Sequence, residues 1–185
     1  VDFLQGFVRT PTSNPPGDTR DGAAYLENFL KARKLAYRVI APRPQMPNLL
    51  ASWDTGRRGR HLVLNGHIDV FPPGRDENWR HGGAWSGSIE AGRLYGRGTA
   101  DMKCGTIASF ATYALLHEFR DRLAGRLTLT AVSDEETGGK WGTGYLFANH
   151  RDEVAGDCCL NGEPSSAYTV RYGENERRAA YENLN

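Results

Sequence analysis

The sequence predicts an α/β protein with a mostly parallel central sheet and helices on both of its faces. Short apolar runs rich in β-branched residues alternate with segments of helical periodicity, which is the pattern of strands joined by crossover helices. Many of the 22 glycines cluster over residues 82–105, 138–144 and 162–173, where they mark tight loops between the elements. In such sheets, sites lie beyond the carboxyl ends of the strands, so these loops are where a site is expected.

Three segments have helical periodicity. The first covers residues 21–34, with Asp21 as the expected N-cap and a stripe of apolar residues along one side. The second begins at residue 102 or 103 and ends at 119, and the third, a short one, covers residues 143–150. The polar residues 174–185 permit helix formation as well.

Six short segments predict strands, among which residues 61–70 contain the continuous apolar run that is typical of a buried strand. The expected strands cover residues 36–40, 48–53, 61–70, 126–133, 157–160 and 169–172. Residues 88–95 predict a small hairpin that turns at Ala91 and Gly92.

The composition is that of one globular domain of ordinary size. Apolar residues make up 39% and charged residues 24% of the 185 residues, which fits a soluble protein rather than a disordered one. A net charge of +1 predicts neither a nucleic-acid partner nor a membrane surface as partner. No apolar run is long enough for a membrane span, and the first residues do not resemble a signal peptide. Three cysteines, two of them adjacent, make a poor disulfide framework and predict a cytoplasmic protein.

The first cluster of chemically useful residues ends the strand at 61–70, where the sequence reads Gly66-His67-Ile68-Asp69. Residues two apart on a strand point to the same side, so His67 can bind a metal ion while Asp69 accepts a hydrogen bond from the other ring nitrogen. Such a carboxylate fixes the tautomer and raises the basicity of the imidazole. Taken alone, the pair also fits a strand-end histidine beside a surface aspartate.

Acidic residues follow two further elements. Asp101 lies where a glycine-rich loop enters a helix, a position where an aspartate can also serve as the N-cap. Asp134, Glu135 and Glu136 end a buried strand in succession, and their mutual repulsion costs stability unless cations offset it. Since consecutive residues point in different directions, one carboxylate can bind a metal ion while its neighbour faces a water molecule. A solvated acidic turn is the alternative interpretation.

Glu163 follows the next short apolar strand, in the sequence Asn161-Gly162-Glu163-Pro164. By itself this is a weak signal. The four segments together place one histidine and several carboxylates at the ends of three strands and at the start of one helix. Imidazole combined with carboxylates suits zinc, cobalt or manganese and not an all-oxygen calcium site.

These four segments read GHIDVFP, GRGTADMKCG, DEETGG and NGEPS, and in this order they resemble the motifs of a family of co-catalytic zinc peptidases and deacylases. The family includes acetylornithine deacetylase, succinyl-diaminopimelate desuccinylase, aminoacylase and carboxypeptidase G. The resemblance covers roughly residues 60–172 and implies a three-layer, zinc-peptidase-like sandwich. It also implies a dinuclear zinc hydrolase of amide bonds in N-acyl amino acids or small peptides, with cobalt or manganese as possible substitutes.

The resemblance implies a role for each matching residue. His67 and Glu163 would hold one zinc ion, Glu136 would hold the other, and Asp101 would bridge both. The peptide bond between Asp101 and Met102 would be cis.

For catalysis, the resemblance implies that Asp69 orients the metal-binding histidine and that Glu135 is the general base. A base in that place takes a proton from the bridging water and delivers it to the leaving amine. Two adjacent cations would polarise the scissile carbonyl and would activate the water.

Family members are much longer than this chain. The resemblance implies a further metal-binding histidine near the end of the catalytic domain and a smaller lid domain, through which full-length subunits can form a homodimer. Residues 1–185 are therefore expected to be the N-terminal portion of the catalytic domain, with a sheet that is incomplete at the C-terminus and little activity by itself.

Two other functions stay open. A non-catalytic remnant that binds at most one metal ion fits the length of the chain. A metallophosphoesterase is the other, because clusters of histidine and acidic residues also serve phosphoryl chemistry. The adjacent Glu135 and Glu136 favour the amide hydrolase, since phosphoesterases depend on several histidines and only five are present. The acyl group and the amine that are released cannot be read from these motifs.

Overall fold

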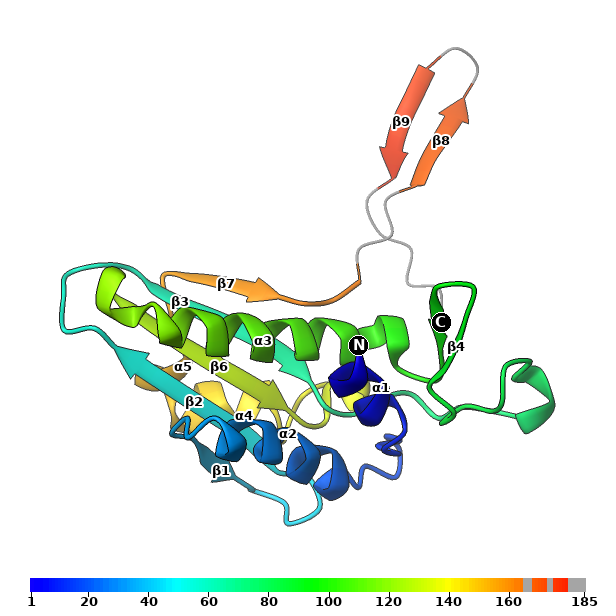
Figure 1. Cartoon of the computed structure of the whole chain (residues 1–185), viewed down its shortest axis with the longest axis horizontal. Coiled ribbons are helices and arrows are strands. Elements are labelled where there is room, and N and C mark those ends of the chain that lie inside the picture. The colour runs from blue at the N-terminus through cyan, green and yellow to red at the C-terminus, as the bar shows by residue number, and fades with distance from the viewer. Residues whose placement is uncertain (165–167, 173–174, 180–185) are drawn as a thin grey trace.

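The computed structural model describes residues 1–164, 168–172 and 175–179, and the side chains of residues 1–164. At its centre lies a five-stranded sheet in the order β1-β2-β6-β3-β7 (Figure 1). The strands are β1 (Arg38–Ile40), β2 (Asn48–Asp54), β3 (His61–His67), β6 (Arg126–Val132) and β7 (Cys158–Asn161). Strand β3 is parallel to β6 and β7, whereas β2 is antiparallel to β1 and β6. Four of the five strands therefore point in one direction, and the predicted α/β class with a mostly parallel sheet is confirmed.

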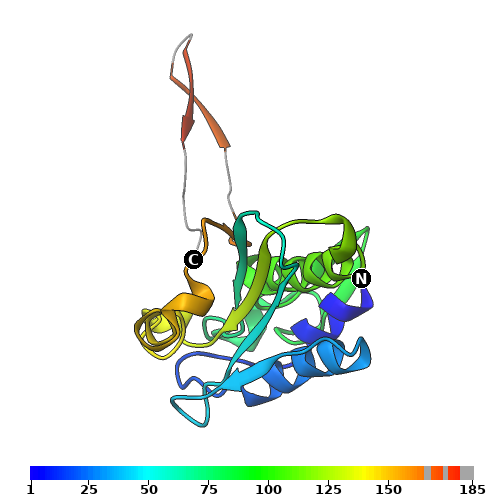
Figure 2. The ribbon, with the colours of Figure 1, turned by 90° about the vertical axis from the view of Figure 1, so that its left-hand side faces the viewer.

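Helices cover both faces of this sheet, as Figure 2 shows from the side. On one face lie α1 (Asp2–Val8), α2 (Arg20–Ala32) and α3 (Cys104–Glu118), and on the other α4 (Thr143–Asn149) and α5 (Arg151–Val154). Because side chains alternate along a strand, Leu49 and Ala51 of β2 pack into the larger core with α2 and α3. Leu50, between them, packs with Leu146 and Val154 in a smaller core under α4 and α5.

Most predicted elements are present, with bounds that differ by a few residues. The predicted hairpin is formed by β4 (Ser88–Glu90) and β5 (Arg93–Tyr95), and Ala91 and Gly92 at its turn both have positive φ. The last predicted strand is β8 (Tyr168–Tyr172). Single helical turns that the sequence did not predict cover Asp76–Asn78, Arg120–Arg122 and Glu135–Thr137. Between Thr99 and Lys103 the backbone is kinked, with non-helical φ and ψ at Asp101 and Met102.

Two local expectations were wrong, and one helix was missed. Helix α1 was not predicted, because its seven residues are too few to show a period; packing of Phe3 against Phe29 of α2 supports it instead. Where the polar C-terminal sequence permits a helix, β9 (Asn175–Ala179) pairs with β8, so strand pairing overrides local preference. The N-cap of α2 is Thr19 rather than Asp21, and the Thr19 hydroxyl pairs with Ser133 Oγ at 2.7 Å instead of capping the helix.

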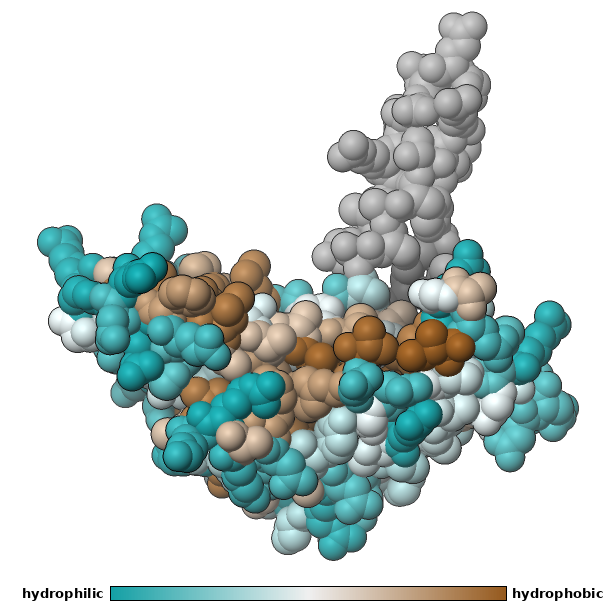
Figure 3. Space-filling view, viewed as in Figure 1, coloured by the Kyte–Doolittle hydropathy of each residue, from teal (hydrophilic) through white to brown (hydrophobic). Residues whose placement is uncertain are grey.

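The surface in the orientation of Figure 1 carries a band of apolar residues at the level of α3, with hydrophilic residues at both ends of the molecule (Figure 3). Leu115 of α3 and Phe119, just after it, are among the exposed large apolar side chains. In the part of the chain that the structure describes, no helix has the length and apolar character that crossing a membrane requires.

Candidate metal centre

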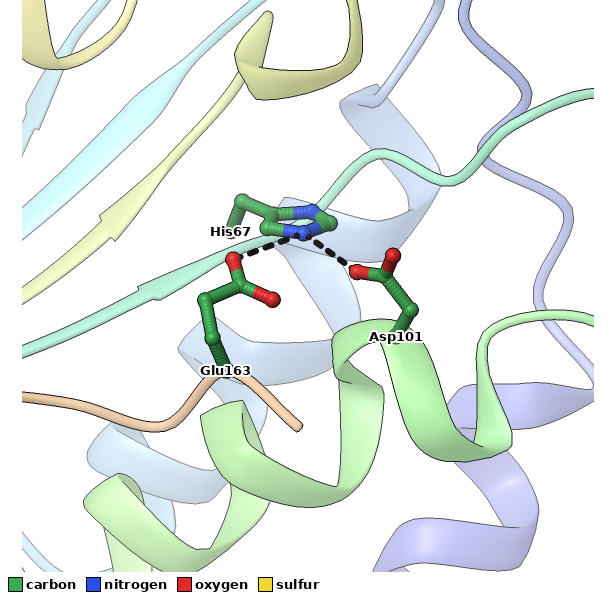
Figure 4. A group of neighbouring side chains, drawn as sticks. All are labelled: His67, Asp101 and Glu163. Carbon is green, nitrogen blue, oxygen red and sulfur yellow. Dashed lines mark hydrogen bonds and ion pairs between the residues drawn. The ribbon is translucent and has the colours of Figure 1, made fainter. Parts of the chain in front are cut away.

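Acidic side chains from three separate segments gather around His67, the last residue of β3. The imidazole is buried, and its Nε2 lies 3.1 Å from Asp101 Oδ1 and 3.3 Å from Glu163 Oε1 (Figure 4). Glu135 Oε2 lies 3.7 Å from the same nitrogen. One ligand atom from each of His67, Asp101 and Glu163 falls within 4.8 Å of the others. These three side chains could therefore hold one metal ion between them.

The topology of the sheet explains this convergence. Strands β3, β6 and β7 are parallel, so the residues that follow them meet at one edge of the sheet. Asp101 arrives from the loop before α3, whose first turn lies directly against the loop after β7. A Cβ at Gly105 would lie 1.9 Å from the carbonyl oxygen of Gly162, so only glycine permits this approach. The close contact brings Asp101 to the same point as Glu163.

The other ring nitrogen of His67 contacts Asp69. Its Nδ1 donates a hydrogen bond to the backbone carbonyl of Asp69 at 2.7 Å, whereas the carboxylate Oδ1 lies 3.5 Å away. The sequence predicted the carboxylate as the partner, and the shorter contact is to the main chain. A carbonyl can only accept, so Nδ1 carries a hydrogen and Nε2 is directed toward the acids.

The carboxylate of Asp69 holds the acidic turn that follows β6. It accepts hydrogen bonds from the backbone N–H groups of Glu135 at 3.2 Å and Glu136 at 3.1 Å. Asp69 is fully buried, so these bonds replace the water that the charge would otherwise require. The residue therefore fixes the acidic turn relative to His67.

The three consecutive acids do point in different directions. Asp134, with a φ of 75°, turns inward and accepts hydrogen bonds from Trp141 N at 2.9 Å and from the Thr137 hydroxyl. Glu136 accepts a hydrogen bond from Phe71 N at 2.8 Å, and Glu135 is half exposed beside the histidine. Two of the three acids are thus directed at the site, and the first stabilises the turn that presents them.

The crowding of carboxylates shifts the ionisation of the whole cluster. Burial by itself would lower the pKa of His67, but the hydrogen bonds that the ring donates to Asp101, Asp69 and Glu163 outweigh it and raise the pKa to about 12. The hydrogen bond from His67 in turn lowers the pKa of Asp101. Burial, followed by the charge of Asp101, raises the pKa of Glu136 to about 7. In the metal-free state a proton on His67 therefore balances part of the charge that a cation would neutralise.

Binding of zinc to the metal-free protein is expected to release protons, so the apparent affinity should rise between about pH 6 and about pH 8. His67 keeps its proton over this range because its pKa is raised to about 12, and a metal-binding imidazole must be neutral. Charged His67 also stabilises the folded, metal-free protein. Its contribution to the free energy of unfolding is fully present below the ordinary imidazole pKa of 6.5 and is lost as the pH rises toward about 12. Calorimetric titration in two buffers of different ionisation enthalpy measures the protons released. An affinity that does not vary with pH would contradict this prediction.

A cavity of about 140 Å³ adjoins the cluster on the side of Asp101 and Glu136. Phe71, Trp79 and Arg97 also line the cavity, so its wall combines two aromatic side chains with one positively charged side chain. A larger cavity of about 330 Å³ lies between the sheet and helices α4 and α5, and no carboxylate lines it. The acids therefore adjoin the smaller of the two cavities.

A lysine of the second motif is buried with backbone partners, and one residue that contacts Asp69 was not identified from the sequence. Lys103 is fully buried and donates hydrogen bonds to the carbonyls of Phe7 at 2.9 Å and Thr10 at 2.7 Å. Burial lowers the pKa of Lys103 to about 7. Asn14 donates a hydrogen bond to Asp69 Oδ2 at 2.8 Å. Asn14 lies in a proline-rich loop whose sequence gave no signal of this contact.

The model of peptidase family M20/M25/M40 matches residues 63–175, which is more than half of the chain and includes all four motifs. The chain belongs to this family. Its members are metal-dependent hydrolases, and the resemblance read from the sequence is confirmed. The peptide bond between Asp101 and Met102 is cis, as the resemblance implied.

Among M20 relatives, a succinyl-diaminopimelate desuccinylase from Methylorubrum extorquens is 41% identical to this chain over 179 residues. The alignment covers 91% of this chain and 44% of the relative, so the chain spans less than half the length of that enzyme.

Solved structures of the family share the fold. An M20 family metallo-carboxypeptidase from Sulfolobus solfataricus superimposes with a TM-score of 0.71 at 21% identity, over 86% of this chain and 36% of the other. A dinuclear metal binding peptidase of the M20 family from Bacillus subtilis gives a TM-score of 0.59 at 14% identity, over 86% of this chain and 40% of that one. At these identities the likeness concerns the fold alone.

Proposed function

We propose that this chain is the metal-binding part of a dinuclear zinc hydrolase that cleaves amide bonds in N-acyl amino acids or small peptides, with Glu135 as the general base. The observation that carries the proposal is the convergence of Asp101, Glu163 and Glu135 on Nε2 of His67 in a member of a metal-dependent peptidase family. One imidazole with several carboxylates is a donor set that suits zinc, and cobalt or manganese can replace it.

These contacts support the proposed ligands. His67, Asp101 and Glu163 would hold one ion, because their ligand atoms already lie within 4.8 Å of one another. Asp101 and Glu136 line one cavity and would hold the second ion between them. Zinc bound there would supply a Lewis acid for the scissile carbonyl and would lower the pKa of a bound water.

The residues of the chain supply the proton transfers. Glu135 is half exposed and close to His67, so its carboxylate can take a proton from water and pass it to the leaving amine nitrogen. Burial raises the pKa of Glu135 above its ordinary value, which makes the carboxylate a better base. Asp69 orients His67 and, through the backbone of the acidic turn, holds Glu135 in place.

The test is a substrate panel with metal analysis on the full-length protein. We expect two zinc ions per chain and hydrolysis of at least one class among N-acetyl amino acids, N-succinyl amino acids and dipeptides. The succinyl compounds are included because the Methylorubrum extorquens relative is named as a desuccinylase. A phosphate monoester serves as the comparison substrate. Cleavage of the ester without cleavage of any amide would overturn the proposal in favour of a phosphoesterase.

The 185-residue protein by itself is expected to bind two zinc ions with unequal affinity and to hydrolyse amides poorly. His67, Asp101 and Glu163 give the first ion three donors, which suffices for a catalytic-type site. For the second ion the described residues supply Asp101 and Glu136, two carboxylates without an imidazole, and these hold zinc more weakly. Calorimetric titration of the metal-free protein measures both affinities. Two equally tight sites, or turnover comparable to that of a full-length relative, would contradict this prediction.

The proposal extends to the whole enzyme. Residues 1–185 would form part of the catalytic domain, and full-length subunits would pair as a homodimer. A cytoplasmic location is supported by Cys104, Cys158 and Cys159, all of which are free thiols.

A further inference from the structure

The segment around Asn14 lies against the chain just after β3, next to the metal centre. Thr12 Oγ1 donates a hydrogen bond to Ile68 O at 2.8 Å, and Val70 N donates to Thr12 O at 3.0 Å. Asn14 N donates to Val70 O at 2.9 Å. This N-terminal segment lies outside residues 63–175, the range that matches the family model. Its backbone is therefore fixed beside the loop that carries Asp69.

The side chain of Asn14 lies between the loops that follow β3 and β6. It is 1% exposed, and its Nδ2 donates one hydrogen bond to Asp69 Oδ2 at 2.8 Å. The second hydrogen is directed at Thr137 Oγ1, 3.1 Å away, and Thr137 in turn donates to Asp134 Oδ1. Nδ2 itself lies 3.5 Å from Asp134 Oδ1. One neutral amide thus faces two buried carboxylates.

Electrostatics explains why a neutral donor occupies this position. Asp69 and Asp134 are both buried, and two carboxylates of like charge repel one another strongly away from water. An amide that donates to both loops offsets this repulsion without adding a charge. An aspartate of almost the same shape would offer only acceptors and a third negative charge.

We propose that Asn14 is a positioning residue of the metal centre. By holding the Asp69 carboxylate and the acidic turn together, it sets the position of His67 relative to Glu135 and Glu136. The Asp69 carboxylate transmits this effect, because it also accepts the backbone hydrogen bonds of both glutamates. The inference rests on the proposed function, since it requires that His67, Asp101 and Glu163 bind a metal ion.

The experiment is a titration of the metal-free protein with Co²⁺, followed by the visible absorption of the bound ion, which reports both affinity and ligand geometry. The variants are Asn14→Ala and Asn14→Asp. Residues that support a metal ligand typically contribute 10–100-fold to metal affinity, so we expect both variants to bind Co²⁺ about 10–100-fold more weakly, with an altered absorption band. Of the two variants, Asn14→Asp should bind Co²⁺ more weakly, because aspartate keeps the volume of asparagine but offers acceptors in place of the two donors.

Thr12→Val is the matched control. It removes one buried hydrogen bond from the same segment, and the acceptor of that bond is the backbone carbonyl of Ile68 rather than a carboxylate. Its thermal unfolding midpoint should fall as that of Asn14→Ala does, while its Co²⁺ affinity and spectrum stay close to wild type. Circular dichroism checks that each variant is folded. If Asn14→Ala does not fold, Asn14→Ser, which keeps one donor, replaces it in the comparison with Thr12→Val.

The outcomes separate the two proposals. If the wild-type protein does not bind Co²⁺ through His67, Asp101 and Glu163, both the proposed function and this inference fail. If wild type binds and both Asn14 variants bind equally well, only the role of Asn14 is overturned. If Asn14→Asp matches wild type while Asn14→Ala is weakened, Asn14 merely fills space. Equal loss in Thr12→Val would assign the effect to docking of the segment and would also overturn the inference.

Discussion

Replacement of Glu135 by glutamine is expected to lower kcat/KM of the full-length enzyme by about 10²–10⁴-fold while leaving its metal content near that of wild type. Glutamine has almost the same shape as glutamate, but its amide cannot accept a proton from water at neutral pH. The side chain is half exposed and lies 3.7 Å from His67 Nε2, on the open side of the cluster. Its loss therefore removes the proton transfer and leaves the three proposed ligands of the first ion in place.

Two further variants make this result specific. Glu90→Gln changes an exposed glutamate of the hairpin whose carboxylate pairs with His81. This variant should leave both activity and metal content unchanged. Glu136→Ala should lower metal occupancy as well as activity, because Glu136 is a proposed ligand and not the base. Metal content by elemental analysis and initial rates on an amide substrate measure both properties. Wild-type activity in Glu135→Gln would eliminate Glu135 as the base.

Replacement of His67 by alanine is expected to weaken metal binding by more than about 100-fold, beyond the 10–100-fold that supporting residues contribute. The imidazole is the one nitrogen donor in the cluster of three ligand atoms, and Asp101 and Glu163 both contact its Nε2. Without the imidazole, the carboxylates of Asp101 and Glu163 face one another with no cation and no proton between them. Their repulsion then pushes the two side chains apart.

His61→Ala is the matched control for this variant. His61 begins the same strand that His67 ends, and its Nε2 contacts Thr128 Oγ1 at 2.8 Å, far from the acidic cluster. Zinc titration of the two metal-free variants should show near wild-type affinity for His61→Ala alone. Equal affinity in His67→Ala would mean that the histidine is not a ligand, and the dinuclear assignment would have to be abandoned.

The family and the location of the site were readable from short stretches of sequence. The residues His67, Glu135, Glu136 and Glu163 each follow an apolar run within a few positions. An apolar run with β-branched residues is a local signal for a buried strand, and parallel strands bring their carboxyl ends to one edge of the sheet. Convergence of the acids on His67 therefore followed from local pattern together with one rule of topology.

Contacts between distant segments were not readable in this way. Asn14 lies 55 positions from Asp69, and nothing in its polar, proline-rich surroundings indicates a partner. Helix α1 depends on aromatic packing against α2, and β9 depends on pairing with β8. In each case the stabilising contact is made with a segment that lies elsewhere in the chain or across a turn.

The sequence by itself determined the α/β class, the family and the set of acidic and histidine side chains at the edge of the sheet. Only the tertiary structure decided that His67 donates to the main chain of Asp69, that Asp134 turns inward, and that Asn14 joins the two loops. The physical reason is that residue type and periodicity report which groups a segment offers, whereas each buried hydrogen bond depends on which groups packing brings within about 3 Å.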